Sequence, residues 1–251
     1  MAQQTARMHV GRVLAQSIYE QSSTKRYPLG TLIELADGRV FVYSQAGASA
    51  LAAGLLTTYL TTYTHEDTVT VAHPVGTRVV TVTGAGVTAN QYEDGYLVVT
   101  EGAGSGEMYQ IKKNAAADGS NLVQVTLYDG IATAWVTSTT DVDLCENPYK
   151  AQVVNPVDAQ QKPTTIPPIP VTAAYYYWGQ VWGVAPLILT MATCGLELDE
   201  KVITASTSTA GEGVIAASPA AAQNNMHVVG YLVAEADIAD STATLIYLRL
   251  V

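Results

Sequence analysis

Short runs of alternating apolar and polar residues, rich in Val, Thr and Tyr, recur along the middle of the chain and predict β-strands. Each run is bounded by Gly, Pro, Asn or Asp, and the spacing of about ten residues is typical of β-sandwiches and barrels. No run with helical periodicity is long enough for a crossover helix, which excludes a parallel α/β sheet in this region. The predicted strands are residues 68–72, 77–83, 95–100, 107–112, 122–127 and 132–136.

The same pattern returns after residue 170, where glycines fall between the runs as they do at the corners of a small barrel. Strands are predicted at residues 171–184, 187–192, 201–205, 213–217, 226–234 and 242–251. Nearer the N-terminus, two β-type runs within residues 27–43 flank Asp37-Gly38 and predict a hairpin, because Asp-Gly supplies the positive φ of a tight turn. Residues 45–56 are compatible with one short helix, although glycines weaken it, and a packed extended segment is the alternative.

Residues 148–170 carry six of the ten prolines and predict a semi-rigid connector between domains. We therefore expect an all-β protein built from tandem small β-barrel or β-sandwich modules, with an extended N-terminal segment. The expected organisation is an N-terminal arm and hairpin region at 1–64, a β domain at 65–147, the linker at 148–170 and a C-terminal β-barrel-like domain at 171–251.

Composition adds a charge pattern to this picture. The 251 residues carry a net charge of −10, which argues against a partner such as nucleic acid, whose phosphates need a broad basic face. Residues 1–64 hold five basic and three acidic side chains, whereas residues 65–170 hold five and twelve and residues 171–251 two and seven. The basic N-terminal end, with Arg7, Arg12 and Arg26, is a candidate for contact with an acidic surface, and a solvated tail is the alternative.

The apolar stretches 46–56 and 183–196 are too short to span a bilayer, and residues 1–16 lack the apolar run of a signal peptide. We therefore expect no membrane partner and synthesis in a cytoplasm. Cys145 and Cys194 lack a metal-type spacing and are interpreted as small buried hydrophobes, with a disulfide or a metal site as the alternatives.

Motifs that could carry chemistry are few. Gly102-Ala-Gly-Ser-Gly106 has neither the spacing nor the following helix of a phosphate-binding loop, and a glycine-rich hairpin loop is the better interpretation. Asp141 and Asp143 share one face of a strand or turn near Glu146, where they could hold Ca²⁺ or serve a hydrolase, and solvated loop carboxylates are the favoured interpretation. The histidines are dispersed and predict structural roles: His9, His65, His73 and His227. We expect no enzyme activity, no cofactor and no metal.

The aromatic run Tyr175-Tyr-Tyr-Trp178, followed by Trp182, is the other prominent motif. In a strand, Tyr175 and Tyr177 face one side while Tyr176, Trp178 and Trp182 face the other. One side must cover a core. The second side either packs on a neighbouring domain or subunit or forms a platform for sugars, and we favour the protein contact because polar groups for sugar hydroxyls are sparse nearby.

Several short motifs occur in an order that resembles one protein family. They are Lys25-Arg-Tyr-Pro-Leu-Gly-Thr31, Ala36-Asp-Gly-Arg-Val-Phe-Val-Tyr43, Gln45-Ala-Gly47, Gly95-Tyr-Leu-Val-Val-Thr-Glu-Gly-Ala-Gly-Ser-Gly106, Tyr109-Gln-Ile111, Val125-Thr-Leu-Tyr-Asp-Gly130, Asn147-Pro-Tyr149, Tyr175-Tyr-Tyr-Trp178, Gln180-Val-Trp-Gly183 and Val229-Gly-Tyr231. Together they resemble the capsid decoration, or cement, proteins found among the head genes of tailed bacteriophages.

This resemblance implies a virion structural protein that binds the outside of the major capsid protein lattice and stabilises the head. It also implies a homo-oligomer, often a trimer, and it carries no catalytic residues to transfer. The physical character agrees, because a Thr-rich, lysine-poor β protein suits a building block covered by its neighbours. We expect the basic N-terminal end to face the shell and the acidic domains to face solvent. The alternatives are a carbohydrate- or receptor-binding module of a phage head or tail fibre, and a hydrolase using Asp141 and Asp143.

Overall fold

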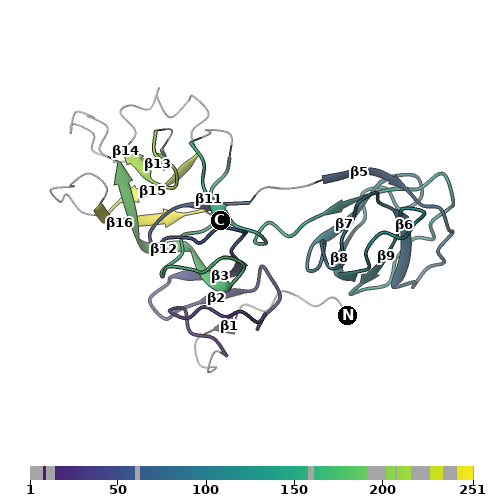
Figure 1. Ribbon diagram of the computed structural model, residues 1–251, viewed down its shortest axis with the longest axis horizontal. Coiled ribbons are helices and arrows are strands. Elements are labelled where there is room, and N and C mark those ends of the chain that lie inside the picture. Colours follow the sequence, from purple (N-terminus) through teal and green to yellow (C-terminus); the bar gives the residue numbers. More distant parts are fainter. Residues whose placement is uncertain are drawn as a thin grey trace. The chain divides into compact units, whose positions relative to one another are not determined.

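The computed structural model describes residues 8–9, 15–59, 63–157, 161–190, 202–206, 208–215, 227–233 and 242–250. Within these residues the protein is all-β, as predicted, with sixteen strands and no helix (Figure 1). The chain divides into two compact units. The first comprises residues 61–148, and the second combines residues 5–60 with residues 149–251.

The first unit is an antiparallel six-stranded sheet in the order β5-β10-β7-β8-β9-β6. Alternate residues of these strands point into one core, which buries Trp135, Tyr92, Ile111 and Leu144 completely or nearly so. The strands are β5 (Tyr63–Thr68), β6 (Val79–Thr83), β7 (Tyr96–Glu101), β8 (Met108–Asn114), β9 (Leu122–Leu127) and β10 (Asp141–Cys145).

Most predicted strands of this unit are confirmed, and three positions differ. The strand expected at 68–72 lies earlier, because β5 ends at Thr68. The strand expected at 132–136 is a single bridge between Trp135 and His73. Strand β10, where the sequence left a strand or a turn open because two aspartates lower strand propensity, is a strand held between β5 and β7 by the buried Val142 and Leu144.

The glycine-rich segment is the loop of the β7–β8 hairpin, as its spacing predicted. Gly102, Gly104 and Gly106 all have positive φ, and no helix follows them. A Cβ on Gly102 would lie 2.0 Å from the carbonyl oxygen of Thr139, so the close approach of two backbones also requires glycine there. His73 is buried and has a structural role, because its Nε2 accepts a hydrogen bond from the main-chain N–H of Thr81 at 3.0 Å.

The second unit contains an eight-stranded sheet in the order β1-β2-β3-β12-β14-β13-β15-β16. Because β12 pairs with β16 as well as with β14, the last five strands close into a barrel around Val181, Leu187, Ile246 and Leu248. The strands are β1 (Met8–His9), β2 (Leu32–Glu34), β3 (Val40–Gln45), β12 (Tyr176–Thr190), β13 (Val202–Ala205), β14 (Gly213–Ile215), β15 (Val228–Leu232) and β16 (Thr242–Arg249), with a separate pair β4 (Thr57–Thr58) and β11 (Val153–Val154).

The hairpin predicted around Asp37-Gly38 is confirmed as β2 and β3, with Gly38 at φ 82°. Residues 45–56 form no helix. They are the packed extended segment, in which Ala46 and Leu51 are buried and bridge to Gln152 and Val171. Residues 161–170, expected as part of a connector, belong to the second unit, because Ile166 is buried in its core and bridges to Gln180.

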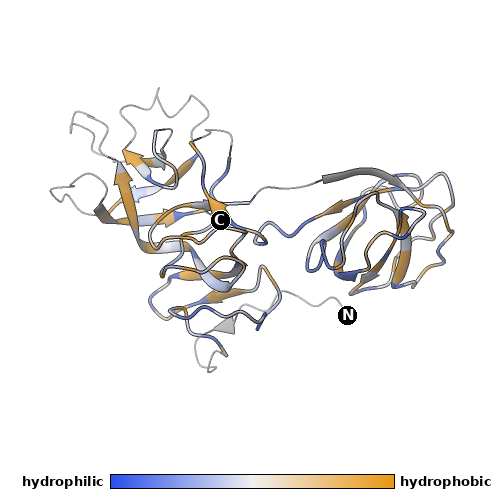
Figure 2. Ribbon diagram, in the orientation of Figure 1, coloured by the Kyte–Doolittle hydropathy of each residue, from blue (hydrophilic) through white to orange (hydrophobic). Residues whose placement is uncertain are grey.

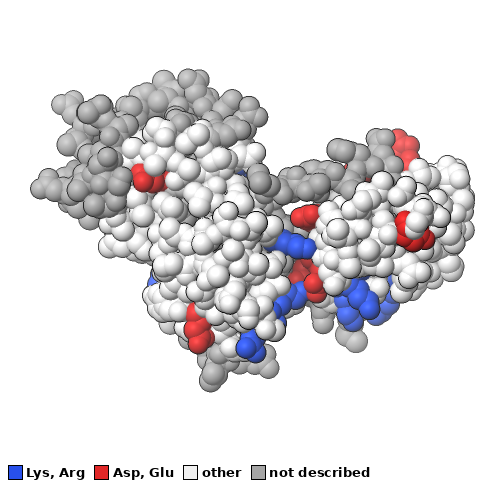
Figure 3. All heavy atoms as spheres, viewed as in Figure 1, with Lys and Arg blue, Asp and Glu red and all other residues white. Residues whose placement is uncertain are grey.

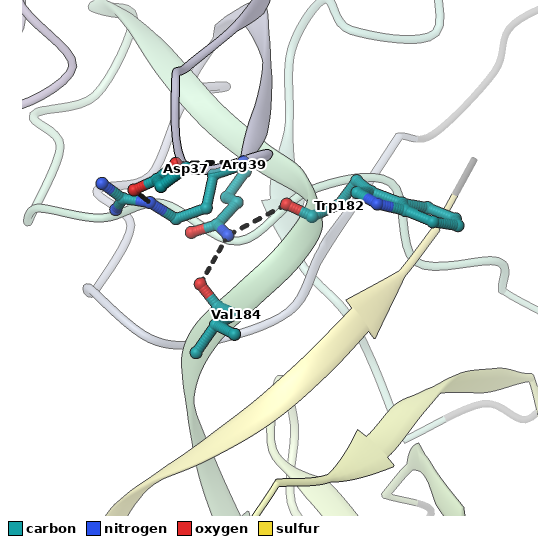
Figure 4. Close-up of polar contacts among 5 residues, drawn as sticks. Asp37, Arg39, Trp182 and Val184 are labelled. Atoms are coloured by element: carbon teal, nitrogen blue, oxygen red, sulfur yellow. Dashed lines mark hydrogen bonds and ion pairs between the residues drawn. The ribbon is translucent and has the colours of Figure 1, made fainter.

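Strand β12 has two parts joined by a bulge. Residues up to Trp182 pair with β3, and residues from Trp182 onward pair with β16. At the register shift between Gln180 and Trp182, the buried Gln180 side chain donates from Nε2 to the carbonyl oxygens of Trp182 at 3.1 Å and Val184 at 2.9 Å (Figure 4). These hydrogen bonds satisfy main-chain carbonyls that lie where the ladder between β12 and β3 is interrupted.

A buried hydroxyl network fixes the other side of β12. The Tyr177 phenol and the Thr165 hydroxyl are 3.1 Å apart, and Thr165 and Thr57 are joined at 2.6 Å. Thr57 also donates to Oε1 of Gln152 at 3.1 Å. Complete burial raises the pKa of Tyr177 to about 12.

We expect Gly183→Ala to destabilise the protein more than Gly38→Ala. Both glycines have positive φ, of 88° and 82°, so both substitutions carry the strain of about 1 kcal/mol that a left-handed alanine costs. Only Gly183 is also crowded, since its Cβ would lie 3.1 Å from Cα of Arg39, whereas nothing lies within 4 Å at Gly38. Urea unfolding should show at least about 1 kcal/mol between the two variants, and equal losses would contradict the crowding argument.

We expect alkaline pH to destabilise the wild type more than Tyr177→Phe. The folded pKa of Tyr177, about 12, lies above the ordinary value of 10.0, so the stability that the neutral phenol contributes is complete below pH 10 and is lost as the pH rises to 12. The difference between the two unfolding free energies should therefore change by about 2 kcal/mol over that interval. Urea unfolding at pH 8 gives the reference, and parallel pH profiles would contradict the assignment.

Candidate interaction face

The basic residues predicted to make contacts are only partly described. Arg7 and Arg12 lie outside the described residues. Arg26 is exposed, and its main-chain N–H donates to the phenol oxygen of Tyr43 at 3.1 Å. The position of Arg26 is therefore fixed by the second unit while its side chain faces solvent.

One side of the aromatic run packs within the chain. Tyr176 and Trp178 meet Tyr27 and Tyr43, with ring centroids of Trp178 and Tyr43 4.9 Å apart. Trp178 has no exposed surface, and its Nε1 donates to the main-chain oxygen of Gln16 at 3.0 Å. Tyr176 and Trp178 therefore hold the segment before β2 against β12 and do not face outward.

Gln16 is the polar centre of this cluster and was not singled out from the sequence. Its side chain is only 2% exposed, accepts from the Tyr43 phenol at 2.8 Å, and donates to the main-chain oxygens of Glu20 and Tyr176 at 3.0 Å each. Burial raises the pKa of the Tyr43 phenol and keeps it a donor. A lone glutamine in a polar segment gives no sequence signal for such a role.

The other side of the run also packs within the chain. Tyr177 is completely buried against Ala46, Leu51 and Val171, and Tyr175 is half-buried beside them. The alternation of faces expected from the sequence is therefore present for Tyr175 to Trp178. Since Trp178 and Tyr177 have no exposed surface, neither offers a platform to an external sugar.

Trp182 lies on the outside of the barrel, because Val181, Ala185 and Leu187 of the same strand point into its core, and Figure 4 shows its indole pointing away from Asp37 and Arg39. Its ring meets Tyr247 edge to face at 5.8 Å, and the guanidinium of Arg249 lies 5.7 Å from the ring centroid. Directly paired residues of β12, β16 and β15 share this side of the sheet. We name the outward residues the outer apolar face: Trp182, Val184, Tyr231, Leu245, Tyr247 and Arg249.

The outer apolar face is unusually open for such side chains. Val184 is 41% exposed, Tyr231 39%, Leu245 53% and Tyr247 41%. Figure 2 shows hydrophobic colours along β12, and few charged side chains appear on the described part of the second unit that Figure 3 presents. A contiguous apolar patch of this kind marks an interaction surface in a protein exposed to water.

The other predicted chemistry is not assembled. Asp141 and Asp143 lie outward on β10, and Glu146 accepts from Nε2 of Gln91 at 3.1 Å. Over the described residues, no group of three potential metal ligands comes together. Cys145 is half-buried, which raises the pKa of its thiol, while Cys194 and the side chains of His9 and His65 lie outside the described residues.

Glu107 has a structural role at the glycine-rich loop. Its carboxylate accepts from the Thr133 hydroxyl at 2.5 Å and from the Tyr109 phenol, and these hydrogen bonds lower the pKa of Glu107. The Tyr109 phenol oxygen in turn accepts from the main-chain N–H of Ala132 at 2.8 Å. The carboxylate therefore ties two loops together.

Comparison with protein-family models, with curated proteins and with solved structures finds no match to this chain. In the described part of the chain, no helix has the length and apolar character to cross a membrane. The assignment of a function accordingly depends on the residues themselves.

We expect Trp178→Ala to cost about 3–5 kcal/mol of unfolding free energy, because it empties a fully buried site and leaves the Gln16 carbonyl without its donor. Trp182→Ala should cost clearly less, since this residue is only partly buried. Urea unfolding of the two variants measures the difference. Equal costs would show that Trp182 is a core residue and not part of an outward face.

Proposed function

We propose that the protein is a capsid decoration protein, which binds the outside of the major capsid protein lattice of a tailed bacteriophage and stabilises the head. The observation that carries the proposal is the outer apolar face, where aromatic and aliphatic side chains stand open to water over three strands. A surface of this kind suits a building block whose faces are covered in an assembly.

The places of the family-like motifs in the fold support the resemblance. Glycines in these motifs sit where backbones approach closely: a Cβ would lie 2.2 Å from the Cys145 oxygen at Gly95 and 2.2 Å from the Tyr247 oxygen at Gly230. In the Asn-Pro-Tyr motif, buried Asn147 donates to the main-chain oxygen of Asp94 at 2.9 Å. The motifs therefore shape the fold, as expected of residues shared for architectural reasons.

The basic N-terminal end supports a direction of binding. Residues 1–64 carry two more basic than acidic side chains, whereas the remainder of the chain is acidic. Arg26, the candidate that the structure describes, is exposed. We infer that this end faces the shell and that the acidic β regions face solvent, an arrangement that salt would weaken.

The test is co-sedimentation with shells assembled from the major capsid protein of the same virus. We expect saturable binding and shells that withstand higher temperature with the protein bound. Replacing Arg7, Arg12 and Arg26 together by Gln should weaken binding at least about tenfold and reduce its salt dependence. This triple variant is preferable to a deletion of residues 1–26, because the deletion also removes Gln16 and with it the partner of Trp178.

A matched control replaces exposed Lys112 and Lys113 of the first unit by Gln, and this variant should bind shells as the wild type does. A wild-type protein that ignores shells would defeat the decoration function. Full binding by the arginine variant would leave that function standing and remove the N-terminal end from the contact.

A carbohydrate- or receptor-binding module is the second candidate, and the outward rings of Trp182, Tyr231 and Tyr247 favour it. It differs from the first in its ligand. Retention on immobilised host polysaccharide that Trp182→Ala abolishes, with no binding to shells, would support it. We place it second because polar groups for sugar hydroxyls are sparse on the outer apolar face. Apart from the three rings, its side chains are Val184, Leu245 and Arg249, of which only Arg249 can form hydrogen bonds.

A further inference from the structure

The outward residues of the first unit can be compared with those of the outer apolar face. In the first unit, most outward positions are polar, namely Thr81, Thr83, Gln110, Gln124 and Thr126, with Val79 and Met108 as exposed exceptions. On the outer apolar face of the second unit, the equivalent outward positions are aromatic or aliphatic apart from Arg249. This face therefore requires a covering partner more than the first unit does.

Charge narrows the choice of partner. The six residues of the outer apolar face include one cation, Arg249, and no carboxylate, although the whole chain carries 22 acidic residues and a net charge of −10. Tyr, Trp and Arg are the residues enriched at protein interfaces, while Asp, Glu and Lys are depleted. The face suits a partner surface that combines apolar side chains with carboxylates.

The first unit carries such a surface. On β10, β7 and β8, Asp143 lies opposite Val98, and Val98 lies opposite Met108, which is 63% exposed. Asp141 lies directly opposite Glu101, and like charges in that position repel each other. Lys112 and Lys113 lie at the other end of β8. We name these outward residues the acidic face: Val98, Glu101, Met108, Asp141 and Asp143.

We propose that the outer apolar face of one copy binds the acidic face of a second copy, with Arg249 placed against Asp141 and Glu101. The guanidinium relieves the repulsion between these two carboxylates, and Met108 and Val98 cover Leu245 and Tyr247. Because the two faces differ, the contact is heterologous and builds a closed ring or an open filament rather than a symmetric pair. Both proposals start from the outer apolar face, but this contact needs no shell, so self-association and shell binding are measured separately.

The experiment measures the mass of the full chain by sedimentation velocity and light scattering over a range of concentrations. The wild type should exceed the 26.5 kDa of one chain, and Leu245→Glu should weaken association at least about tenfold. Val79→Glu is the matched control, because Val79 is 50% exposed, against 53% for Leu245, and lies on β6, outside both faces. It should associate as the wild type does.

A charge exchange tests the pairing itself. Arg249→Glu alone and Asp141→Arg alone should each weaken association, and the double variant should restore it, because the opposite charges then face each other again. A wild type that is a monomer at every concentration overturns the proposal, as does an equal effect of Leu245→Glu and Val79→Glu. A double variant that stays dissociated overturns the assignment of the acidic face. If the wild type is a monomer and Leu245→Glu abolishes its binding to shells, the outer apolar face binds the capsid protein and not a second copy.

Discussion

The second unit depends on one buried side chain at the bulge of β12. Strand β12 pairs with β3 up to Trp182 and with β16 from Trp182 onward, and its ladder with β3 shifts register between Gln180 and Trp182. The Gln180 amide, which is 2% exposed, satisfies the carbonyls of Trp182 and Val184. Trp178 and Trp182 lie on the same side of β12, and only Trp178 is covered by Tyr27, Tyr43 and the segment around Gln16.

Much of the fold follows from local pattern. Residues of the strands around Val80, Leu97 and Val123 alternate between the core and solvent. Asp37-Gly38 predicts a tight turn, and Gly38 has the positive φ that such a turn needs. For β10 the sequence left a strand or a turn open, because two aspartates lower the strand propensity of this half-buried segment. The sequence predicted two strands, 171–184 and 187–192, whereas β12 runs unbroken from Tyr176 to Thr190 and changes partner at Trp182, which only long-range pairing determines.

The candidate face was partly visible in the sequence. The run Leu245-Ile-Tyr-Leu-Arg249 is apolar on both sides of a strand, which indicates that neither side is meant for water. The aromatic run around Tyr177 attracted attention for its composition, yet most of its rings serve the interior. Which aromatic residues remain outside depends on long-range pairing of β12 with β3 and β16, and no local rule supplies that information.

The small pair β4 and β11 gives the chain a modular character. Thr58 and Val153 are direct partners across this pair, so the chain leaves the second unit and re-enters it at adjacent positions. The whole first unit is thus an insert in a loop whose ends are already joined, and such an insert adds little to the entropy of closing the loop. Removal of this insert would leave the strand pairings of the barrel and of its hairpin in place, because none of them involves residues 61–148.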